Sequence, residues 1–252
     1  RSLHPKPHFL GIGTQKGGTT SLYQILKTHP EIFLPDNKEI HYFTKHFALG
    51  KDWYLEQFKE ASAGKLRGEI TPYYLFHEAA PKRINSFNSN ILLIALLRNP
   101  IERTLSQYFH SIRLGLEQLP LEDALEVEET RLKGSLELIK KPGGTHTSHQ
   151  EHSYLSRSRY DIQLKRYFEL FNRKNILVLR SEDLFNDSHN ALLKITNFLT
   201  IKPFQNNIKI PQANTGYGES SKVSYKVRYK LEKDLATTLK WLDKELDISW
   251  DI

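Results

Sequence analysis

The 252-residue sequence contains no cysteine and no methionine. Without cysteine the chain cannot form disulfide bonds, which suits a reducing compartment such as the cytoplasm. No apolar run approaches the roughly 18 residues that a membrane-spanning helix needs, and the first ten residues show no secretory signal. We therefore expect a cytoplasmic protein that makes no contact with a membrane.

The chain also lacks an initiating methionine. Its length of 252 residues fits one α/β domain with a large buried core. We expect residues 1–252 to be a single domain excised from a larger modular protein.

A long run of basic residues is absent too, although 36 Lys and Arg outnumber 29 Asp and Glu and give a net charge of +7. Such an excess favours anionic partners. Because the basic residues are spread out and form no recognised nucleic-acid motif, we expect no nucleic acid partner. A phosphorylated small molecule or an acidic carrier protein accounts for the charge as well.

Residues 9–22, FLGIGTQKGGTTSL, have the pattern of a phosphate cradle. The apolar run Phe9–Gly13 predicts a buried strand, and the polar turn after it contains Lys16, Gly17 and Gly18. Three residues of helix-capping type then open a helix: Thr19, Thr20 and Ser21. A helix N-terminus and a lysine together favour an anion. The alternative is an ordinary turn with a surface lysine.

This turn is not a standard ATP-binding loop, in which a lysine follows the last glycine of GxxxxGK[ST]. Here Lys16 precedes Gly17 and Gly18. We expect a phosphate-like anion, without the usual γ-phosphate and Mg²⁺ chemistry.

Strand-like and helix-like segments alternate along the chain. Strands are expected at 9–13, 32–34, 66–70, 91–97 and 176–179. Helices are expected at 19–28, 52–61, 78–87, 100–113, 121–133, 156–171, 188–199 and 225–246, with a mobile loop or lid at 135–153. This alternation predicts an α/β fold in which a mainly parallel central sheet is flanked by helices, with a P-loop-like turn after the first strand.

Ligands of parallel sheets bind beyond the carboxyl ends of the strands. Lys16 follows the first expected strand, Glu69 ends the third and Arg98 follows the fourth. Arg98 suits a bidentate phosphate contact, and Ser106, two turns into the next helix, could add a hydroxyl. The alternatives are strand-end ion pairs for Glu69 and Arg98 and a plain helix serine at Ser106.

Several of these segments resemble the sulfotransferases that use 3′-phosphoadenosine 5′-phosphosulfate (PAPS). TQKGGTTSL and LLRNPIERTLSQYFHSIR are similar to the two nucleotide-binding motifs of that family. KEIHYF, GEITPYYLF, SRYDIQLKRYFELF and ILVLRSEDLF resemble the heparan sulfate sulfotransferase branch. The resemblance is closer still to sulfotransferase domains of cyanobacterial polyketide synthases, of the olefin synthase and curacin type.

The resemblance implies a residue for each role. Lys16, Gly17, Gly18, Thr19, Thr20 and Ser21 would hold the 5′-phosphosulfate, and Arg98 and Ser106 the 3′-phosphate. Tyr160 and the Gly216–Tyr217–Gly218 loop would line the nucleotide pocket. Glu69 matches the catalytic carboxylate. Two departures are Ile70, where a lysine often follows that carboxylate, and Ser158–Arg159, where a glycine is usual.

Sulfuryl transfer resembles phosphoryl transfer and needs a cationic, donor-rich cradle. The positive charge of Lys16 would stabilise the negative charge that develops on the leaving phosphate, and this transfer requires no metal. The acceptor hydroxyl needs a base, for which Glu69 is the first candidate and His41 the second, with Lys38 orienting the sulfate or the base. The alternative for His41 is packing beside Tyr42 and Phe43.

Four functional hypotheses follow. The first is PAPS-dependent sulfation of a β-hydroxyacyl chain on an acyl carrier protein, beside thioesterase and synthase domains, with PAP as product and decarboxylative elimination to a terminal alkene as the next step. The second changes the acceptor to a glycan or small alcohol. The third is a non-catalytic nucleotide-binding module. The fourth, a kinase, is disfavoured by the position of Lys16.

Two further patterns have simpler alternatives. His146, His149 and His152 have a spacing that suggests a metal, but no cysteine accompanies them. Basic residues of the last helix could meet an acidic carrier, although a solvated helix face explains them equally: Lys226, Arg228, Lys230 and Lys233.

Overall fold

The computed structural model describes residues 5–205, 208–211 and 218–252. In this part of the chain a five-stranded sheet has the order β2-β3-β1-β4-β5, and each neighbouring pair is parallel. Its strands are β1 (Phe9–Gly13), β2 (Ile32–Phe33), β3 (Leu66–Ile70), β4 (Leu92–Leu97) and β5 (Ile176–Arg180). The predicted α/β fold with a parallel central sheet is confirmed.

The helices follow in chain order. The first half contains α1 (Thr19–Lys27), η1 (Phe47–Leu49), α2 (Lys51–Glu56), α3 (Tyr73–Phe76), α4 (Ala80–Phe87), α5 (Pro100–Arg113), α6 (Leu121–Glu126) and α7 (Glu128–Leu132). The second half contains α8 (Ser135–Ile139), α9 (Thr147–Glu151), η2 (Ser156–Ser158), α10 (Tyr160–Leu170), η3 (Arg173–Asn175), α11 (Ser181–Asn186), α12 (Ser188–Leu199), η4 (Glu219–Lys222), α13 (Tyr225–Asp234) and α14 (Ala236–Leu246).

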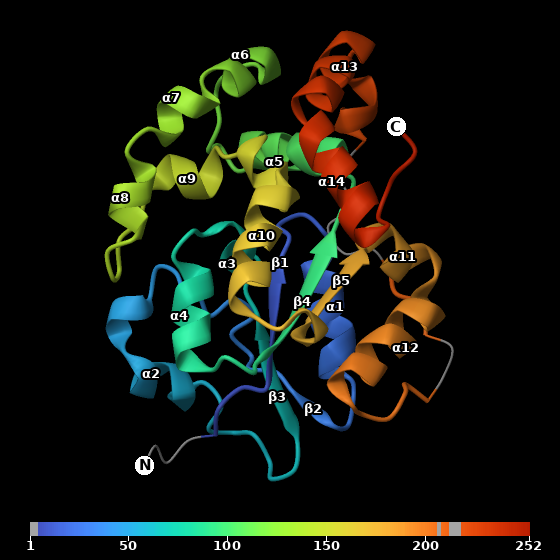
Figure 1. The fold of residues 1–252 in the computed structure, drawn as a ribbon. Coiled ribbons are helices and arrows are strands. Elements are labelled where there is room, and N and C mark those ends of the chain that lie inside the picture. The colour runs from blue at the N-terminus through green and yellow to red at the C-terminus, as the bar shows by residue number, and fades with distance from the viewer. Residues whose placement is uncertain (1–4, 206–207, 212–217) are drawn as a thin grey trace.

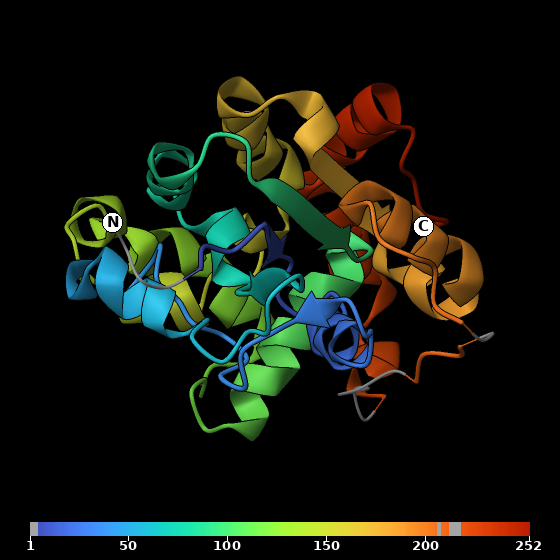
Figure 2. The ribbon, with the colours of Figure 1, turned by 90° about the horizontal axis from the view of Figure 1, so that it is seen from below.

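The central strand β4 is apolar on both sides because helices cover both faces of the sheet (Figure 1). Leu93, Ala95 and Leu97 pack in one cluster with α4, α10 and α14. Ile94 and Leu96 pack in the other with α1, α11 and α12. Figure 2 shows these two helical layers on either side of the strands.

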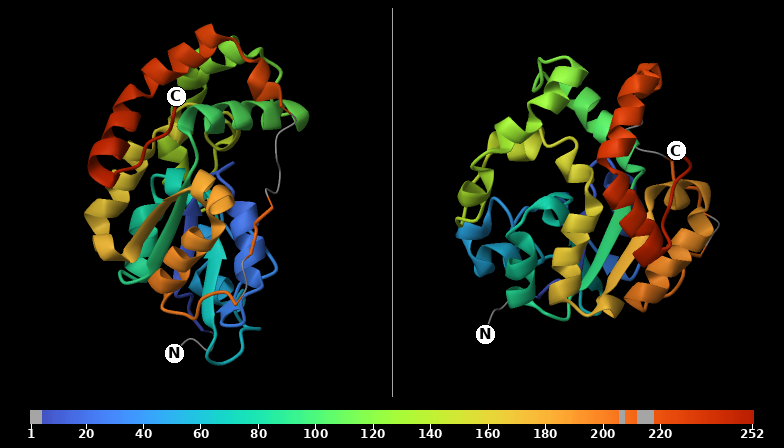
Figure 3. Two further views of the ribbon diagram at one scale, coloured as in Figure 1. Left: turned by 90° about the vertical axis from the view of Figure 1, so that its right-hand side faces the viewer. Right: turned by 45° about the horizontal axis from the view of Figure 1, so that its top comes forward.

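A third group of helices lies above the carboxyl ends of the strands. Figure 1 and Figure 3 show α5 to α9 and α13 at this end of the molecule, with α5 crossing the strand ends. Of these helices, α5 and α9 place side chains over the edge of the sheet where parallel folds bind their ligands.

Several boundary predictions are wrong. The expected helix 52–61 ends at Glu56, and the expected helix 156–171 is interrupted at Arg159, between η2 and α10. The expected helix 121–133 is broken at Val127, and there Glu128 accepts hydrogen bonds from the main-chain N–H groups of Leu155 and Ser156 at 2.8 Å each. The expected helix 225–246 is divided at buried Leu235. The expected loop 135–153 contains α8 and α9, because His146 caps α9 by accepting the N–H of His149 at 3.1 Å.

Candidate functional site

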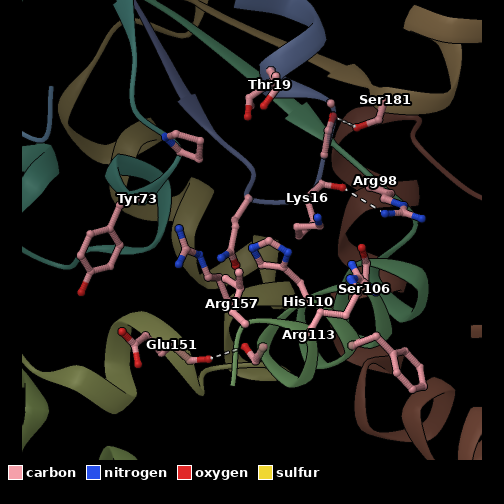
Figure 4. Close-up of a pocket in the computed structure, with 18 of the residues that line it drawn as sticks. Lys16, Thr19, Tyr73, Arg98, Ser106, His110, Arg113, Glu151, Arg157 and Ser181 are labelled. Atoms are coloured by element: carbon pink, nitrogen blue, oxygen red, sulfur yellow. Dashed lines mark hydrogen bonds between the residues drawn. The ribbon is translucent and has the colours of Figure 1, made fainter. Parts of the chain in front are cut away.

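A cavity of about 590 Å³ opens beyond the carboxyl ends of the strands. Its wall comes from the turn between β1 and α1, from the loop before α2, from α5, and from the segment joining α9 to α10. Figure 4 shows Arg98 and Ser106 together on one side of this view and Tyr73 on the other. Most of the residues proposed from the sequence meet here.

The turn after β1 has the backbone of an anion cradle. Lys16 (φ 62°) and Gly18 (φ 89°) both adopt the left-handed region, and Gly18 opens α1 without a side chain that could cap it. The first helical bond runs from the N–H of Leu22 to the carbonyl oxygen of Gly18 at 3.0 Å. The N–H groups of the preceding helical residues therefore have no acceptor within the helix.

Gly17 is required by close packing. A Cβ atom there would lie 2.7 Å from Cγ2 and 2.9 Å from the carbonyl oxygen of Thr14. Ser181, at the start of α11, donates its hydroxyl to the carbonyl oxygen of Gly17 at 2.5 Å. Thr14 and Ser181 therefore fix the turn at Gly17 from both sides.

Lys16 is surrounded by other cations. Burial, followed by the charges of Arg113, Arg98 and Lys38, lowers the pKa of Lys16 to about 8. This concentration of positive charge indicates a site for a ligand with more than one negative charge.

Arg98 and Ser106 line the cavity at the β4–α5 junction. Arg98 donates to the carbonyl oxygen of Lys16 at 3.1 Å, which ties the junction to the cradle. Asn99 caps α5 by accepting the N–H groups of Ile101 and Glu102. The helix thus begins where the expected 3′-phosphate contacts are.

His110 and Arg113 also line the cavity and were not proposed from the sequence. They lie four and seven residues after Ser106, so all three occupy one face of α5 (Figure 4). This helical spacing was visible in the sequence and could have identified them.

Tyr160 does not line the cavity as expected. It is completely buried, and its hydroxyl donates to the carbonyl oxygen of Arg98 at 2.7 Å, so it supports the strand end from behind. Ser21 is also buried and contacts the carbonyl oxygen of Pro211. Gly216 and Tyr217 lie outside the described residues, whereas Gly218 lines the cavity.

Lys38, Glu39 and His41 face the cavity from the loop after β2. Lys38 donates to the hydroxyl of Thr20 at 2.5 Å and lies 3.6 Å from Glu39. Nε2 of His41 lies 3.3 Å from Oε2 of Glu39. The loop therefore brings a carboxylate–imidazole pair next to the cradle.

Opposing effects set the charges of this pair. Burial would raise the pKa of Glu39, but the hydrogen bond from His41 and the charge of Lys38 lower it overall. Burial lowers the pKa of His41 more than Glu39 raises it. The carboxylate is ionised and the imidazole neutral at neutral pH. Glu39 was not proposed from the sequence, where it appeared only within the motif KEIHYF.

Glu69 lies behind the cavity wall, not within it. Its carboxyl group is buried and accepts hydrogen bonds from the hydroxyls of Thr71 (2.7 Å), Tyr54 (2.8 Å) and Tyr74 (2.7 Å). Burial raises the pKa of Glu69 to about 7, although the three hydrogen bonds oppose this. Thr71 also accepts the main-chain N–H of His41 at 3.3 Å, so Glu69 reaches the site through Thr71.

Arg157 is a further cavity residue that the sequence placed only on a helix. Its side chain comes from η2, and the Cζ atom of its guanidinium lies over the ring of Tyr73, 5.1 Å from the ring centre. Burial lowers the pKa of Arg157 to about 10, so it stays charged at neutral pH.

The three histidines that suggested a metal have other contacts. His149 is buried and shares a 2.6 Å hydrogen bond with the hydroxyl of Tyr73, and Nε2 of His152 lies 2.8 Å from the carbonyl oxygen of Leu116. Within the described ranges no group of three or more His, Asp or Glu side chains is arranged to hold a metal ion. The same ranges include no helix long and apolar enough to cross a membrane.

The fold and the cavity define an α/β protein with a phosphate cradle and a second basic site at the carboxyl edge of its sheet. The chain matches the sulfotransferase domain family over residues 6–233 and belongs to that family.

Two characterised relatives are enzymes of this type. The chain is 29% identical over 77% of its length to the membrane-associated sulfotransferase kil1 of Dictyostelium discoideum, of which the match covers 56%. It is 26% identical over 96% of its length to mouse heparan sulfate glucosamine 3-O-sulfotransferase 5, of which the match covers 66%. The chain thus spans less than two thirds of each relative.

Solved structures share the fold. A sulfotransferase from Alicyclobacillus acidocaldarius has a TM-score of 0.80 at 22% identity and covers 98% of both chains. Mouse SULT7A1, solved with PAP, has a TM-score of 0.57 at 18% identity over 98% of this chain and 88% of its own. The sulfotransferase domain of the Synechococcus olefin synthase has a TM-score of 0.53 at 15% identity over 92% and 95%, respectively.

Proposed function

We propose that this sulfotransferase takes its sulfuryl group from PAPS and releases PAP. The observation that carries the proposal is the pair of basic sites joined by the hydrogen bond from Arg98 to the carbonyl oxygen of Lys16. PAPS has phosphate groups at both ends of its ribose, and one cradle cannot hold both. The PAP complex of the structurally similar mouse protein supports this choice.

The donor sites divide between two elements. The N-terminus of α1 and Lys16 receive the 5′-phosphosulfate, and Arg98 with Ser106 receives the 3′-phosphate. During transfer the acceptor oxygen forms a bond to sulfur while the bond from sulfur to the bridging oxygen of the 5′-phosphate breaks. Lys16 stabilises the negative charge that develops on this phosphate.

The acceptor hydroxyl loses its proton to the neutral imidazole of His41, and the carboxylate of Glu39 orients this imidazole and stabilises its charged form. Both residues line the cavity, whereas the carboxyl group of Glu69 is enclosed by three hydroxyl donors. We therefore propose that Glu69 is a positioning residue that orients Thr71 and, through it, the backbone of His41. This assignment replaces the expectation that Glu69 itself is the base.

Replacing His41 with Gln should lower kcat about 10²–10⁴-fold, the usual contribution of a general base, while the affinity for PAP is kept. Glu69→Gln should mainly lower the thermal midpoint, because an amide cannot accept all three hydroxyl donors. Single-turnover transfer of ³⁵S, PAP calorimetry and thermal melts measure the three quantities.

A fully stable Glu69→Gln variant that has lost turnover, beside an active His41→Gln variant, would return the role of base to Glu69. The conservative pair Glu39→Asp and Glu39→Gln provides the matched control, since only the first keeps a carboxylate for His41.

We propose a carrier-bound β-hydroxyacyl chain as the acceptor. An apolar rim at the end of α5 supports this choice, because Leu114 and Leu116 line the cavity yet are 58% and 40% exposed. Exposed leucines beside a binding cavity suit an aliphatic ligand. An acyl carrier protein would present the chain at this rim.

A glycan is the second candidate acceptor, favoured by the similarity to heparan sulfate 3-O-sulfotransferases. Transfer of ³⁵S from labelled PAPS to a β-hydroxyacyl carrier protein, measured beside heparan sulfate, decides between them. Labelling of the carrier alone supports the proposal, labelling of the glycan alone overturns the acyl acceptor, and labelling of neither overturns both acceptors.

A further inference from the structure

Arg157 is buried with most of its hydrogen-bonding capacity unused. Arg157 is 4% exposed, and its Nε atom has no hydrogen-bond partner among the residues that the structure describes. A guanidinium has five N–H donors. In the described part of the chain one of them makes a long hydrogen bond, 3.4 Å from Nη1 to the carbonyl oxygen of Gln150. No carboxylate of that part lies within ion-pair distance of it.

The surroundings of Arg157 fix its orientation without satisfying it. The Cζ atom of Arg157 lies 5.1 Å from the ring centre of Tyr73 and 5.6 Å from that of Phe76. Stacking of this kind holds the plane of the group but uses none of its N–H donors. Because a buried polar group without partners is costly, a rigid charged fork lining the cavity indicates a ligand oxygen.

The position of Arg157 assigns this oxygen to the acceptor. The two anionic groups of the donor are accounted for by the cradle at Lys16 and by Arg98 with Ser106. Arg157 comes from η2, stacks on Tyr73 of α3, and lies near enough to Glu39 and His41 for its charge to act on both of their pKa values. That is the side of the cavity where the acceptor hydroxyl must meet its base.

We propose that Arg157 binds an acyl oxygen of the acceptor, namely the carbonyl or carboxylate oxygen that stands close to the reacting hydroxyl. This inference rests on the proposed sulfuryl transfer and specifies its acceptor as a hydroxyacyl compound. The apolar tail of this acceptor would lie toward Leu114 and Leu116, and its acyl group toward Arg157. A thioester and a free acid both supply such an oxygen.

Three small acceptors test the inference: the pantetheine thioester of 3-hydroxyoctanoate, free 3-hydroxyoctanoate, and heptan-2-ol, which is the same chain without its acyl carbon. With ³⁵S-labelled PAPS, the wild type should prefer the acyl compounds to heptan-2-ol by about 10–100-fold in kcat/KM, as expected for a charge-assisted hydrogen bond. In Arg157→Met this preference should disappear, and in Arg157→Lys it should be partly kept.

PAP calorimetry shows whether each variant is folded and keeps its donor site. Arg159→Met is the matched control. Arg159 lies two residues after Arg157 and carries the same charge, but its side chain does not line the cavity. Titration of 3-hydroxyoctanoate into the PAP-bound protein gives a second readout, in which Arg157→Met alone should lose affinity.

An equal loss on all three acceptors in Arg157→Met, or an unchanged preference, would overturn the role of Arg157. If the wild type binds PAP but sulfates none of the three, the acyl acceptor and Arg157's role both fall while the donor site stands. If it does not bind PAP, the proposed function itself fails. The faster of the two acyl compounds shows whether the oxygen belongs to a thioester or to a free acid.

Discussion

The surroundings of Lys16 disfavour the charged form of its side chain. Its left-handed backbone, at φ 62°, turns the chain so that the carbonyl oxygen accepts Arg98. Burial and three neighbouring cations lower its pKa to about 8. A bound phosphate reverses this balance, because an anion favours the charged form of the lysine.

The affinity for PAP should therefore depend on pH. In the free protein Lys16 loses its proton as the pH rises through about 8, whereas in the complex its pKa is higher. Between these two values binding takes up a proton, so Kd should rise by up to about tenfold per pH unit above pH 8. Calorimetry at pH 7 to 9.5, in buffers of different ionisation enthalpy, measures both quantities.

Lys16→Arg is the matched variant for this measurement. An arginine stays charged over the whole range, so its Kd should vary much less with pH whatever its absolute value. Equal Kd values for the wild type at pH 7 and 9.5 would contradict the assignment of Lys16 to the donor phosphate.

At the scale of the element, α5 connects the donor site to the core. One face presents Ser106, His110 and Arg113 to the cavity. One turn before Ser106 on the same side of the helix, Arg103 is completely buried and donates to Ser158 Oγ (2.5 Å), to Gln107 Oε1 (2.9 Å) and to the carbonyl oxygen of Tyr154. Arg103 also reaches Gln15 of the cradle turn at 3.4 Å.

Replacing Arg103 with Met should lower the free energy of unfolding by about 2–4 kcal/mol, because it removes buried hydrogen bonds to Ser158, Gln107 and Tyr154. Urea denaturation measures this value. Arg228→Met provides the control, since Arg228 forms a partly exposed ion pair with Glu102 on the same helix and should contribute about 0–1 kcal/mol. Similar losses in the two variants would show that Arg103 is not a structural tie.

At the scale of the whole molecule, the proposed donor site joins elements that are far apart in the chain. The cradle belongs to the β1–α1 turn, the second basic site to the β4–α5 junction, and Ser181 of α11 holds the cradle from β5. A PAP molecule in contact with the first two should stabilise the folded state as a unit.

We expect PAP at 100 times its Kd to add about 2.7 kcal/mol to the free energy of unfolding. ATP at the same concentration should add much less, because it has no 3′-phosphate for Arg98 and Ser106. Thermal melts with each nucleotide, for the wild type and for Arg98→Met, measure the difference. Equal stabilisation by ATP would favour a kinase-like site over the proposed donor site.

The sequence by itself determined the features that depend on neighbouring residues. The apolar run of β4, the Asn99–Pro100 start of α5 and the glycine turn after β1 are local signals, and each element formed where it was predicted. Parallel order also follows from alternating strands and helices, so the meeting of Lys16 and Arg98 at one edge was predictable.

The tertiary structure alone decided which polar groups reach the cavity. Glu69 and Arg157 are both charged residues in sequence, but Tyr54 and Tyr74 enclose the first, while Tyr73 and Phe76 hold the second at the cavity wall. Tyr73 and Phe76 are in α3, far from Arg157 of η2 in the chain. Tyr54 is in α2, and Glu69 is in the following strand β3. Burial and hydrogen bonding depend on such contacts between distant segments, and no local pattern contains them.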